Sequence, residues 1–311
     1  MKRFISSLLL FIPFAIGIYI VLIAVWGNYA PFQLKRNLNF PHATGFTCSR
    51  MKNIREYRNI DILFLGSSHT YSSFDPRIFK QYGLTVFNLG TSAQSHMQTE
   101  LLLKRYLDEL NPELIVYDVY PEVFQFDGVE SATNIMANDR NDIESVKMAL
   151  ALNHVKAYNS LIYGFYRDIF KEEVDCSEEL TRVGERYIDG GFVEVGALYY
   201  KPVEIPEIYW NITEKQVKYF ERSLELIREH EIPVILVQTP ITNVMYQSIR
   251  NNDEFDEMMR SYGVYYNFNE LVELDDELHF FDEDHLNQTG VEIFSEKLME
   301  VLQEEVMMSA Q

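Results

Sequence analysis

Two short segments at opposite ends of the chain carry the residue types of a serine nucleophile and its base. The first is an apolar run that ends at Gly66 and then presents Ser67 and Ser68. The second places Asp282 three residues before His285, just ahead of a segment with helical periodicity. A serine hydroxyl is a weak nucleophile until a base accepts its proton, and the base needs a carboxylate that orients it. The two segments supply all three groups, in the chain order Ser…Asp…His.

Ser68 follows a predicted strand and a glycine, and it opens a predicted helix. This arrangement exposes the hydroxyl at the carboxyl edge of a sheet, beside the N–H groups of the turn, as in a nucleophile elbow. The G-x-S-x-G pattern of that elbow is absent. Taken alone, Gly-Ser-Ser is equally an ordinary strand-to-helix turn with a capping serine. The nucleophile hypothesis therefore depends on the second segment.

In a short loop, an aspartate three residues before a histidine can accept a hydrogen bond from one ring nitrogen of the imidazole. The other nitrogen then faces the nucleophile. Asp284 competes with Asp282 for this role, but neighbouring side chains of an extended chain point to opposite sides. Asp282 is therefore the predicted partner of His285. The alternative for this segment alone is a solvated acidic turn that caps the last helix.

Predicted strands and helices alternate through most of the chain. The fold that they form determines whether the segment with Ser68 lies close to the segment with Asp282 and His285. The strands are 61–65, 84–89, 113–119, 233–237 and 264–268, and the helices are 97–110, 214–229, 253–262 and 288–303, with a further helix start at Asp75-Pro76. Such alternation predicts a parallel, doubly wound α/β sheet with right-handed connections. In that sheet the end of the first strand and the loop before the last helix lie at the same edge.

Residues 122–212 fit the alternation poorly. Within them, 142–170 is predicted to be helical, and 172–206 is mixed and rich in acidic residues. We interpret the segment as an insertion into one domain over 59–308. It would lie near the carboxyl ends of the strands, where open α/β sheets bind their ligands.

The first segment of the chain has the composition of a membrane span. Residues 4–26 are apolar apart from two serines, which is long enough for a helix to cross a hydrocarbon core of about 30 Å. Trp26 and Tyr29 fit an interfacial aromatic belt. A cleaved signal peptide is the alternative, but its apolar region is usually only about 7–15 residues. We predict an uncleaved anchor over 1–30 and an irregular membrane-proximal stem over 31–58.

The basic residues around this span bear on its orientation. Lys2 and Arg3 favour a cytoplasmic N-terminus, whereas Lys35 and Arg36 on the other flank oppose it. We predict a single-pass protein with a cytoplasmic N-terminus and an extracytoplasmic C-terminal domain. A cytoplasmic enzyme behind a reversed anchor is the alternative.

Composition limits the partners and cofactors. The chain has 311 residues, 47% of them hydrophobic, which suits one large α/β domain. Its net charge of −20 makes nucleic acid an improbable partner, because phosphate contacts need clustered basic residues. Cys48 and Cys176 could pair in an exported domain or remain two unrelated thiols, and neither has CxxC spacing. We predict neither a metal site nor an organic cofactor.

With both segments in view, the chain resembles the SGNH/GDSL hydrolase superfamily. The first motif of that superfamily, Gly-Asp-Ser, matches residues 66–68, and its last motif, Asp-x-x-His-Leu, matches residues 282–286. The resemblance implies Ser68 as the nucleophile, His285 as the base and Asp282 as its partner. It also implies a flavodoxin-like arrangement of the doubly wound sheet.

The resemblance covers roughly residues 59–123 and 214–306. The second motif block of the superfamily contributes to the oxyanion hole. That block, Asn-x-x-x-Ser-Gly, places Ala93 where the family has a glycine whose N–H binds the oxyanion. An alanine keeps this donor if the backbone does not require a positive φ. The resemblance therefore implies the N–H groups of Ser68 and Ala93 as donors, with Gly90 as the second choice under a shifted alignment.

The third motif block departs from the family. Its usual Gly-x-Asn-Asp supplies an asparagine donor, whereas residues 117–121 read Tyr-Asp-Val-Tyr-Pro. Losing one oxyanion donor costs about 10²–10³ in rate. Either another group replaces the asparagine or the site is weakly hydrolytic.

Membrane-anchored members of the superfamily share these features. The D-alanyl transfer protein of teichoic-acid modification and the alginate and peptidoglycan O-acetylation proteins combine an N-terminal anchor with Gly-Ser-Ser or Gly-Thr-Ser. Several lack a recognisable Gly-x-Asn-Asp, and they typically work beside a multi-span membrane O-acyltransferase. The resemblance is one of architecture and motif style.

The resemblance implies an extracytoplasmic serine acyltransferase or esterase that acts on acyl groups, O-acetyl above all, of a cell-surface glycan or polymer. The alternative is a catalytically weak or inactive binding or assembly protein of the same fold that partners a membrane O-acyltransferase. Ser67, His69 and Gly90 are candidates for substrate contact, and His69 is alternatively a solvated turn histidine.

Overall fold

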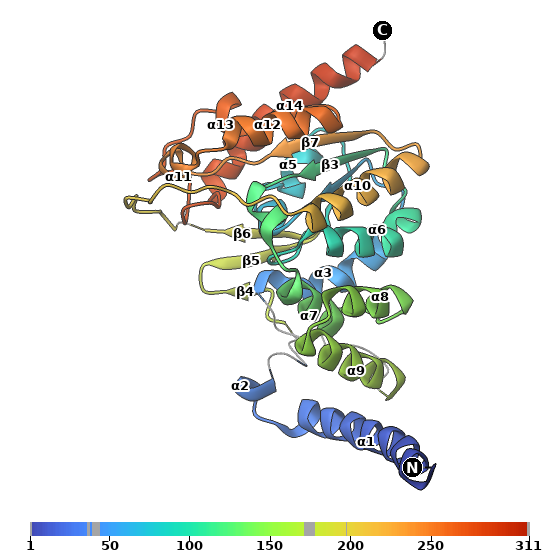
Figure 1. The fold of residues 1–311 in the computed structure, drawn as a ribbon. Coiled ribbons are helices and arrows are strands. Elements are labelled where there is room, and N and C mark those ends of the chain that lie inside the picture. Colours follow the sequence, from blue (N-terminus) through green and yellow to red (C-terminus); the bar gives the residue numbers. More distant parts are fainter. Residues whose placement is uncertain (1, 36–37, 39–43, 171–177, 197, 310–311) are drawn as a thin grey trace.

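A five-stranded parallel β-sheet lies at the centre of the protein (Figure 1). The computed structural model describes residues 2–35, 38, 44–170, 178–196 and 198–309. The strands of the sheet are β1 (Ile62–Leu65), β2 (Val86–Asn88), β3 (Leu114–Asp118), β7 (Val234–Gln238) and β8 (Tyr265–Asn267). They follow the order β2-β1-β3-β7-β8, and each neighbouring pair is parallel. The predicted parallel α/β sheet is therefore confirmed.

Helices cover both faces of this sheet. One face carries α6 (His96–Leu110), α10 (Glu214–Glu229) and α12 (Asn252–Tyr262), and the other carries α5 (Pro76–Gln81), α13 (Phe268–Leu271) and α14 (Gln288–Ser309). Alternate strand residues serve the two layers: Leu63 packs with the first set, and Phe64 packs with the second. Because neither face meets water, β1 is apolar at every position rather than at every other one.

Local signals in the sequence fix several helix ends. Asp75 caps α5 by accepting the N–H of Arg77 at 2.9 Å, and Pro76 is the first helical residue, both as predicted. The predicted helical segment 142–170 is divided into α8 (Ile143–Leu152) and α9 (Val155–Phe170). Asn153 ends α8 in the left-handed conformation with φ 47°, which asparagine adopts at lower cost than most residues.

The segment between β3 and α10 adds a second, smaller sheet. Strands β4 (Thr181–Arg182), β5 (Glu185–Ile188) and β6 (Phe192–Val195) pair in antiparallel fashion. The turn between β5 and β6 reaches the central sheet, since the N–H of Asn88 at the end of β2 donates to Gly190 at 2.9 Å. A side chain at Gly191 would lie 2.5 Å from the carbonyl oxygen of Asn88, so the close approach needs glycine there. The small sheet thus lies against the carboxyl edge of the central one.

The remaining short elements connect these layers. They are α2 (Phe32–Lys35), η1 (Thr44–Phe46), α3 (Thr47–Asn53), η2 (Ile54–Glu56), α4 (Ser68–Ser73), η3 (Pro121–Gln125), α7 (Val129–Asn138) and α11 (Asn243–Ser248).

The predicted irregular stem is wrong over residues 44–56. These residues form α3 and its flanking turns, and α3 is buried against α7. Arg50 on α3 is fully buried, donates to the carbonyl oxygens of Gly45 and Gly191 at 2.8 and 3.0 Å, and stacks over Tyr71. These two hydrogen bonds and the ring contact offset part of the cost of burying the guanidinium, whose Nη2 has no hydrogen-bond partner among the described residues. A sequence with Arg50 in mid-segment gives no sign of this burial.

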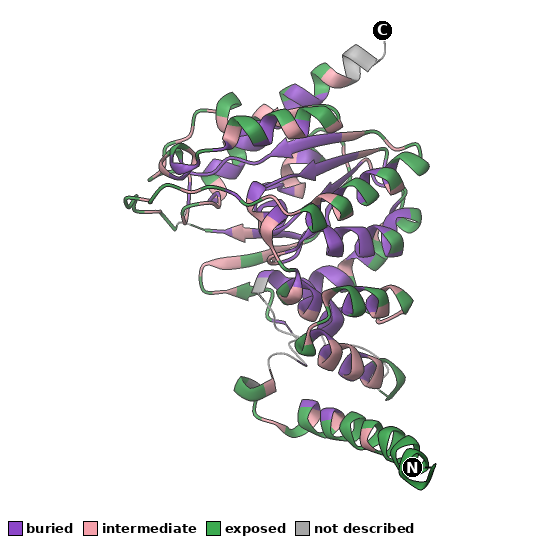
Figure 2. Cartoon of the chain, in the orientation of Figure 1, coloured by how far each residue is buried: buried purple, intermediate pink, exposed green. Residues whose placement is uncertain are grey.

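Helix α1 (Lys2–Tyr29) lies at the edge of the molecule and is exposed along most of its length (Figure 2). Among the described residues, α1 is the helix that is long and apolar enough to cross a membrane. A signal sequence near the N-terminus can meet the same criteria of length and composition. Its second half packs on α9: Gly27 lies against the Tyr163 ring, and the amide of Asn28 donates to the hydroxyl of Tyr166 at 3.1 Å. Helix α1 therefore contacts the domain directly.

Candidate active site

Ser68 lies at the sharp turn between β1 and α4. Gly66 holds this turn with φ 146°, and a Cβ there would lie 2.2 Å from the hydroxyl oxygen of Thr70, so no other residue fits. Ser67 is buried at the N-cap of α4, and Ser68 is the first residue of the helix. The turn therefore places Ser68 at the carboxyl edge of the central sheet, as the sequence predicts.

His285 connects Ser68 to Asp282. The hydroxyl oxygen of Ser68 lies 2.9 Å from His285 Nε2, and His285 Nδ1 lies 3.0 Å from Asp282 Oδ1. The same carboxylate accepts the backbone N–H groups of Asp284 and His285 at 3.1 and 2.8 Å. The loop thus curls back as predicted, and the structure brings the three predicted residues together in one hydrogen-bonded chain.

Asp284 also reaches His285, contrary to the expectation that it is poorly placed. Its Oδ1 lies 2.9 Å from His285 Nδ1, as near as Asp282. The expectation assumed an extended chain, whereas residues 281–284 form a bend in which neighbouring side chains converge. Asp284 is also the more buried of the two carboxylates, with 17% of its side chain exposed against 36% for Asp282.

These carboxylates govern the charge of His285. Burial disfavours the imidazolium, but the negative charge of Asp284, the hydrogen bond that His285 donates to Asp282 and the further attraction of both carboxylates together raise the pKa of His285 to about 10. Burial likewise disfavours the Asp284 carboxylate, yet the imidazole beside it holds the pKa of Asp284 well below its usual range. The pair therefore strongly stabilises the imidazolium form of the base.

The predicted oxyanion loop contains a strained alanine. Ala93 has φ 49°, in the left-handed region that favours glycine. An alanine was expected to replace the family glycine only if the backbone at this position does not require a positive φ, and that condition is not met. Ala93 nevertheless still carries the N–H. The loop is held by Gln94, whose side chain accepts from Thr91 and donates to Thr99 at 2.9 and 3.0 Å. Gly90 lies against the nucleophile turn, since a Cβ there would be 2.3 Å from the Ser67 carbonyl oxygen.

Replacing Ala93 with glycine should relieve this strain. A left-handed alanine costs about 1–2 kcal/mol, part of which glycine loses again through its greater freedom in the unfolded chain. We expect Ala93→Gly to raise the free energy of unfolding of the full-length protein in detergent by about 0.5–1 kcal/mol, seen as a higher Tm. Ala151→Gly, at an exposed helical position of α8, should instead lower stability by about 1 kcal/mol. A fall of similar size in both variants would contradict the strain argument.

The third motif block supplies buried acids and a phenol in place of an asparagine. Asp118, the last residue of β3, accepts from the hydroxyl and N–H of Thr239 at 3.0 and 3.3 Å, and burial raises the pKa of Asp118 to about 7. Burial also raises the pKa of Tyr120 well above its ordinary value. Glu122 follows the same trend, because burial and then Asp284 raise its pKa to about 6. The surroundings of His285 are therefore strongly acidic.

The interpretation of His69 as a solvated turn histidine is wrong. Its side chain is buried and stacks on the ring of His285, with centroids 4.6 Å apart and planes 12° from parallel. The other two candidates for substrate contact, Ser67 and Gly90, are buried as well. The position of His69 directly after Ser68, on the first turn of a helix, is the sequence signal that pointed toward the site.

His69, Asp284 and His285 also have the ligand types of a metal site. Their donor atoms all lie within 4.8 Å of one another, a spacing that one divalent cation could bridge. However, both ring nitrogens of His285 are already engaged, Nε2 by Ser68 and Nδ1 by Asp282. We therefore interpret the cluster as acid–base machinery.

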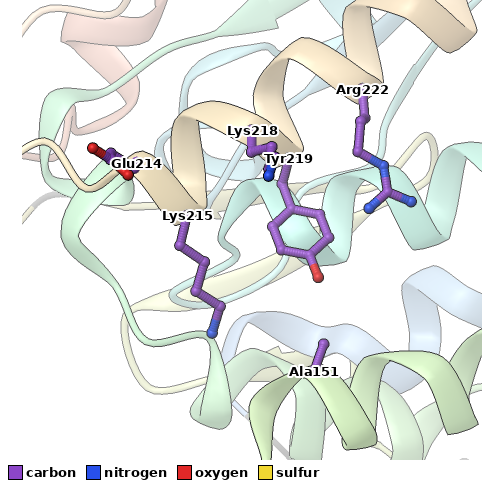
Figure 3. A pocket seen from close by; sticks show the side chains of 6 residues that line it. All are labelled: Ala151, Glu214, Lys215, Lys218, Tyr219 and Arg222. Atoms are coloured by element: carbon purple, nitrogen blue, oxygen red, sulfur yellow. The ribbon is translucent and has the colours of Figure 1, made fainter.

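A separate pocket lies on the surface between α10 and α8 (Figure 3). The side chains of Lys215, Tyr219 and Arg222 point from α10 toward Ala151 on α8. None of the residues around Ser68 lines this pocket, so the arrangement at His285 does not depend on it.

The predicted link between the two cysteines lies partly outside the described residues. Cys48 is buried on α3, whereas Cys176 lies outside the described ranges. Their pairing stays a prediction.

Comparisons with known proteins find similarity only at the level of structure. No family model matches the chain, and no curated protein matches it. A solved structure from Bacteroides fragilis, described as a "putative acylhydrolase", has a TM-score of 0.41 and 11% identity over 82% of this chain and 94% of its own. A GDSL-like lipase from Bacteroides thetaiotaomicron has a TM-score of 0.40 and 13% identity over 86% and 98%.

Proposed function

We propose that the protein is an SGNH-type serine esterase or O-acyltransferase, anchored in a membrane by α1, that acts on acyl groups of a cell-surface glycan or polymer. The observation that carries the proposal is the hydrogen-bonded chain from Ser68 through His285 to Asp282, with distances of 2.9 and 3.0 Å. These residues come from opposite ends of the sequence and meet at the carboxyl edge of a parallel sheet. An ordinary capping serine has no need of a histidine backed by a carboxylate.

In the proposed reaction, neutral His285 accepts the hydroxyl proton of Ser68 at Nε2 while the Ser68 oxygen bonds to the acyl carbonyl carbon. The carbonyl oxygen becomes an oxyanion, which the N–H groups of Ser68 and Ala93 bind. The tetrahedral intermediate then expels the donor alcohol, which takes the proton back from His285. An acyl-enzyme on Ser68 is left.

The second half of the reaction returns Ser68 to its free form. A water molecule or a sugar hydroxyl attacks the acyl-enzyme, and His285 accepts its proton. Breakdown of the second tetrahedral intermediate releases Ser68, to which His285 gives the proton back. Water yields a free acid, as in an esterase, and a sugar hydroxyl yields a new ester, as in a transferase. Both routes share every residue up to the acyl-enzyme.

The membrane setting supports a substrate at the cell surface. Helix α1 meets the requirements of a span, and its contact with α9 holds the domain next to that span. We propose that the N-terminus is cytoplasmic and that the domain is extracytoplasmic, where glycans and polymers carry O-acetyl groups. A multi-span membrane O-acyltransferase is the partner that this setting favours.

Covalent labelling tests the proposal directly. A fluorophosphonate probe reacts with a serine activated by a neighbouring base, and we expect it to label the full-length protein at Ser68, as identified by peptide mass spectrometry. Ser73→Ala, on the same short helix, should keep the label, whereas Ser68→Ala should lose it. Incubation with an activated acetyl ester, with and without a candidate glycan, then separates transfer from hydrolysis by the product formed. A folded protein that takes no label at Ser68 would refute a serine mechanism.

A binding or assembly protein of the same fold is the second candidate. The absence of an asparagine in the third motif block and the strained alanine at position 93 favour it, because both weaken an oxyanion hole. If the protein is of this second kind, Ser68→Ala should change neither the amount of fluorophosphonate label that the protein takes up nor its association with a membrane acyltransferase.

A further inference from the structure

The site contains a second imidazole that the reaction above does not use. His69 is buried directly after the nucleophile, and its ring stacks on that of His285 at 4.6 Å. The ring of Tyr120, from the segment after β3, packs against it at 4.0 Å. His69 is therefore fixed between the base and the third motif block, with no path to solvent for its ring.

The two oxygens of Asp284 face one nitrogen of each imidazole. Its Oδ1 is 2.9 Å from His285 Nδ1, and its Oδ2 is 3.6 Å from His69 Nε2. Within the described part of the chain, neither ring nitrogen of His69 has a hydrogen-bond partner. Buried polar atoms are nearly always satisfied in folded proteins. A small movement that closes the gap of 3.6 Å would give His69 the acceptor that it lacks.

The arrangement bears on how well His285 can act as a base. Asp282 and Asp284 both stabilise its imidazolium form, and a base that is held protonated cannot accept the proton of Ser68. A donor at the second oxygen of Asp284 stabilises the charge of that carboxylate and weakens its attraction for the proton on His285. Such a donor makes it easier for His285 to release its proton.

The groups that face His69 are few and come from two elements. Asp284 and His285 approach from the loop before α14, and Tyr120 approaches from the segment after β3. Burial, and then the neighbouring His285, lower the pKa of His69 to about 3. His69 is therefore a neutral ring with one N–H to donate.

We propose that His69 is a positioning residue that donates its Nε2–H to Asp284, shares this carboxylate with His285 and so lets His285 give up its proton at the end of each half of the reaction. The proposal rests on the function proposed above, because it assigns His69 a role in the same site. It assigns His69 no bond to the substrate.

Two variants of His69 separate donation from packing. His69→Phe keeps a flat ring against His285 but removes the donor, whereas His69→Gln keeps an N–H that can reach Asp284. We expect the rising limb of the pH profile of kcat/KM to move up by about one unit in His69→Phe, which lowers the rate at a fixed pH on that limb about tenfold. His69→Gln should stay within a few tenths of a unit of the native profile.

A double variant tests the route through Asp284. Once Asp284 is replaced by asparagine, no negative charge remains for His69 to share. We therefore expect His69→Phe/Asp284→Asn to have the profile of Asp284→Asn alone, a coupling that a purely structural role for His69 would not produce. Histidine NMR of the full-length protein in detergent follows the titration of His285 without any substrate. It should show a higher pKa of His285 in His69→Phe than in the native protein, and no difference between Asp284→Asn and the double variant.

The outcomes distinguish this proposal from the proposed function. Native activity that survives Ser68→Ala would refute the serine mechanism, and the role of His69 with it. Activity that depends on Ser68, together with a folded His69→Phe whose His285 titrates as in the native protein, would overturn the role of His69 and leave the mechanism intact. Additive shifts in the double variant would overturn it as well.

Discussion

Ser68→Ala should lower kcat/KM for an activated acetyl ester by about 10³–10⁴ or more, the loss expected when a nucleophile is removed from a triad. The reason is local: Ser68 is the hydroxyl that lies 2.9 Å from His285 Nε2. The adjacent Ser67 is buried at the N-cap of α4. Initial rates of the full-length protein in detergent, with the blank reaction subtracted, measure the loss.

Non-additivity identifies the residues that act as a unit. His285→Ala should cost nearly as much as Ser68→Ala, and the double variant should be no slower than either alone, because neither residue works without the other. Ser73→Ala, on the same helix, should stay within about twofold of the native rate if its buried hydroxyl serves packing alone. Equal losses at Ser68 and Ser73 would indicate damage to α4 rather than loss of a nucleophile.

The sequence predicted those parts of the site that depend on topology. Continuous apolar runs such as β1 are typical of strands covered on both faces, and parallel strands bring their carboxyl ends to one edge. Ser68 at the end of β1 and His285 before α14 therefore had to lie near each other. The spacing of Asp282 and His285 allowed the prediction of their hydrogen bond, because a carboxylate three residues before a histidine in a short loop can reach one ring nitrogen.

Features that depend on local backbone conformation were not predictable in this way. Asp284 converges on His285 because the loop bends, whereas the sequence suggested extended chain. The positive φ of Ala93 arises from a loop held by Gln94 and its partners, which no residue pattern reveals. The helix around Arg50 was missed because burial of a guanidinium depends on carbonyl groups contributed by the distant Gly191. These contacts are long-range, and only the folded chain assembles them.

The two carboxylates at His285 lead to the second prediction, a pH profile displaced to high pH. Asp284 and Asp282 raise the pKa of His285 from its usual 6.5 to about 10. The base must be neutral to accept the proton of Ser68, so kcat/KM should rise with pH up to about 10, and at pH 7 about one molecule in 10³ holds the neutral base. Because this is a raised pKa, the corresponding stabilisation of the fold is present at low pH and is lost as pH rises through about 10.

Asp284→Asn should move the rising limb of this profile to lower pH. Removing one negative charge at 2.9 Å from Nδ1 lowers the pKa of His285 by about 1–3 units, so the rate at pH 7 should increase by about tenfold or more. Asp282→Asn removes a charge too, but it also replaces one of the two oxygens that face His285 Nδ1, at 3.0 and 3.1 Å, with an amide group that can only donate. We expect its profile to shift in the same direction while its plateau falls by about 10²–10⁴, because the imidazole loses its orientation.

The contrast between the two variants assigns the roles of the two carboxylates. A plateau that falls in Asp284→Asn and survives in Asp282→Asn would exchange them, making Asp284 the orienting partner. An activated acetyl ester hydrolyses by itself at high pH, so each rate is corrected with Ser68→Ala at the same pH and ionic strength. If Asp282 orients the base and Asp284 sets its charge, the pH at which the site works depends on how strongly Asp284 interacts with His285 and how strongly with His69. That makes the neighbours of Asp284, rather than the triad itself, the place where the working pH of this protein can change.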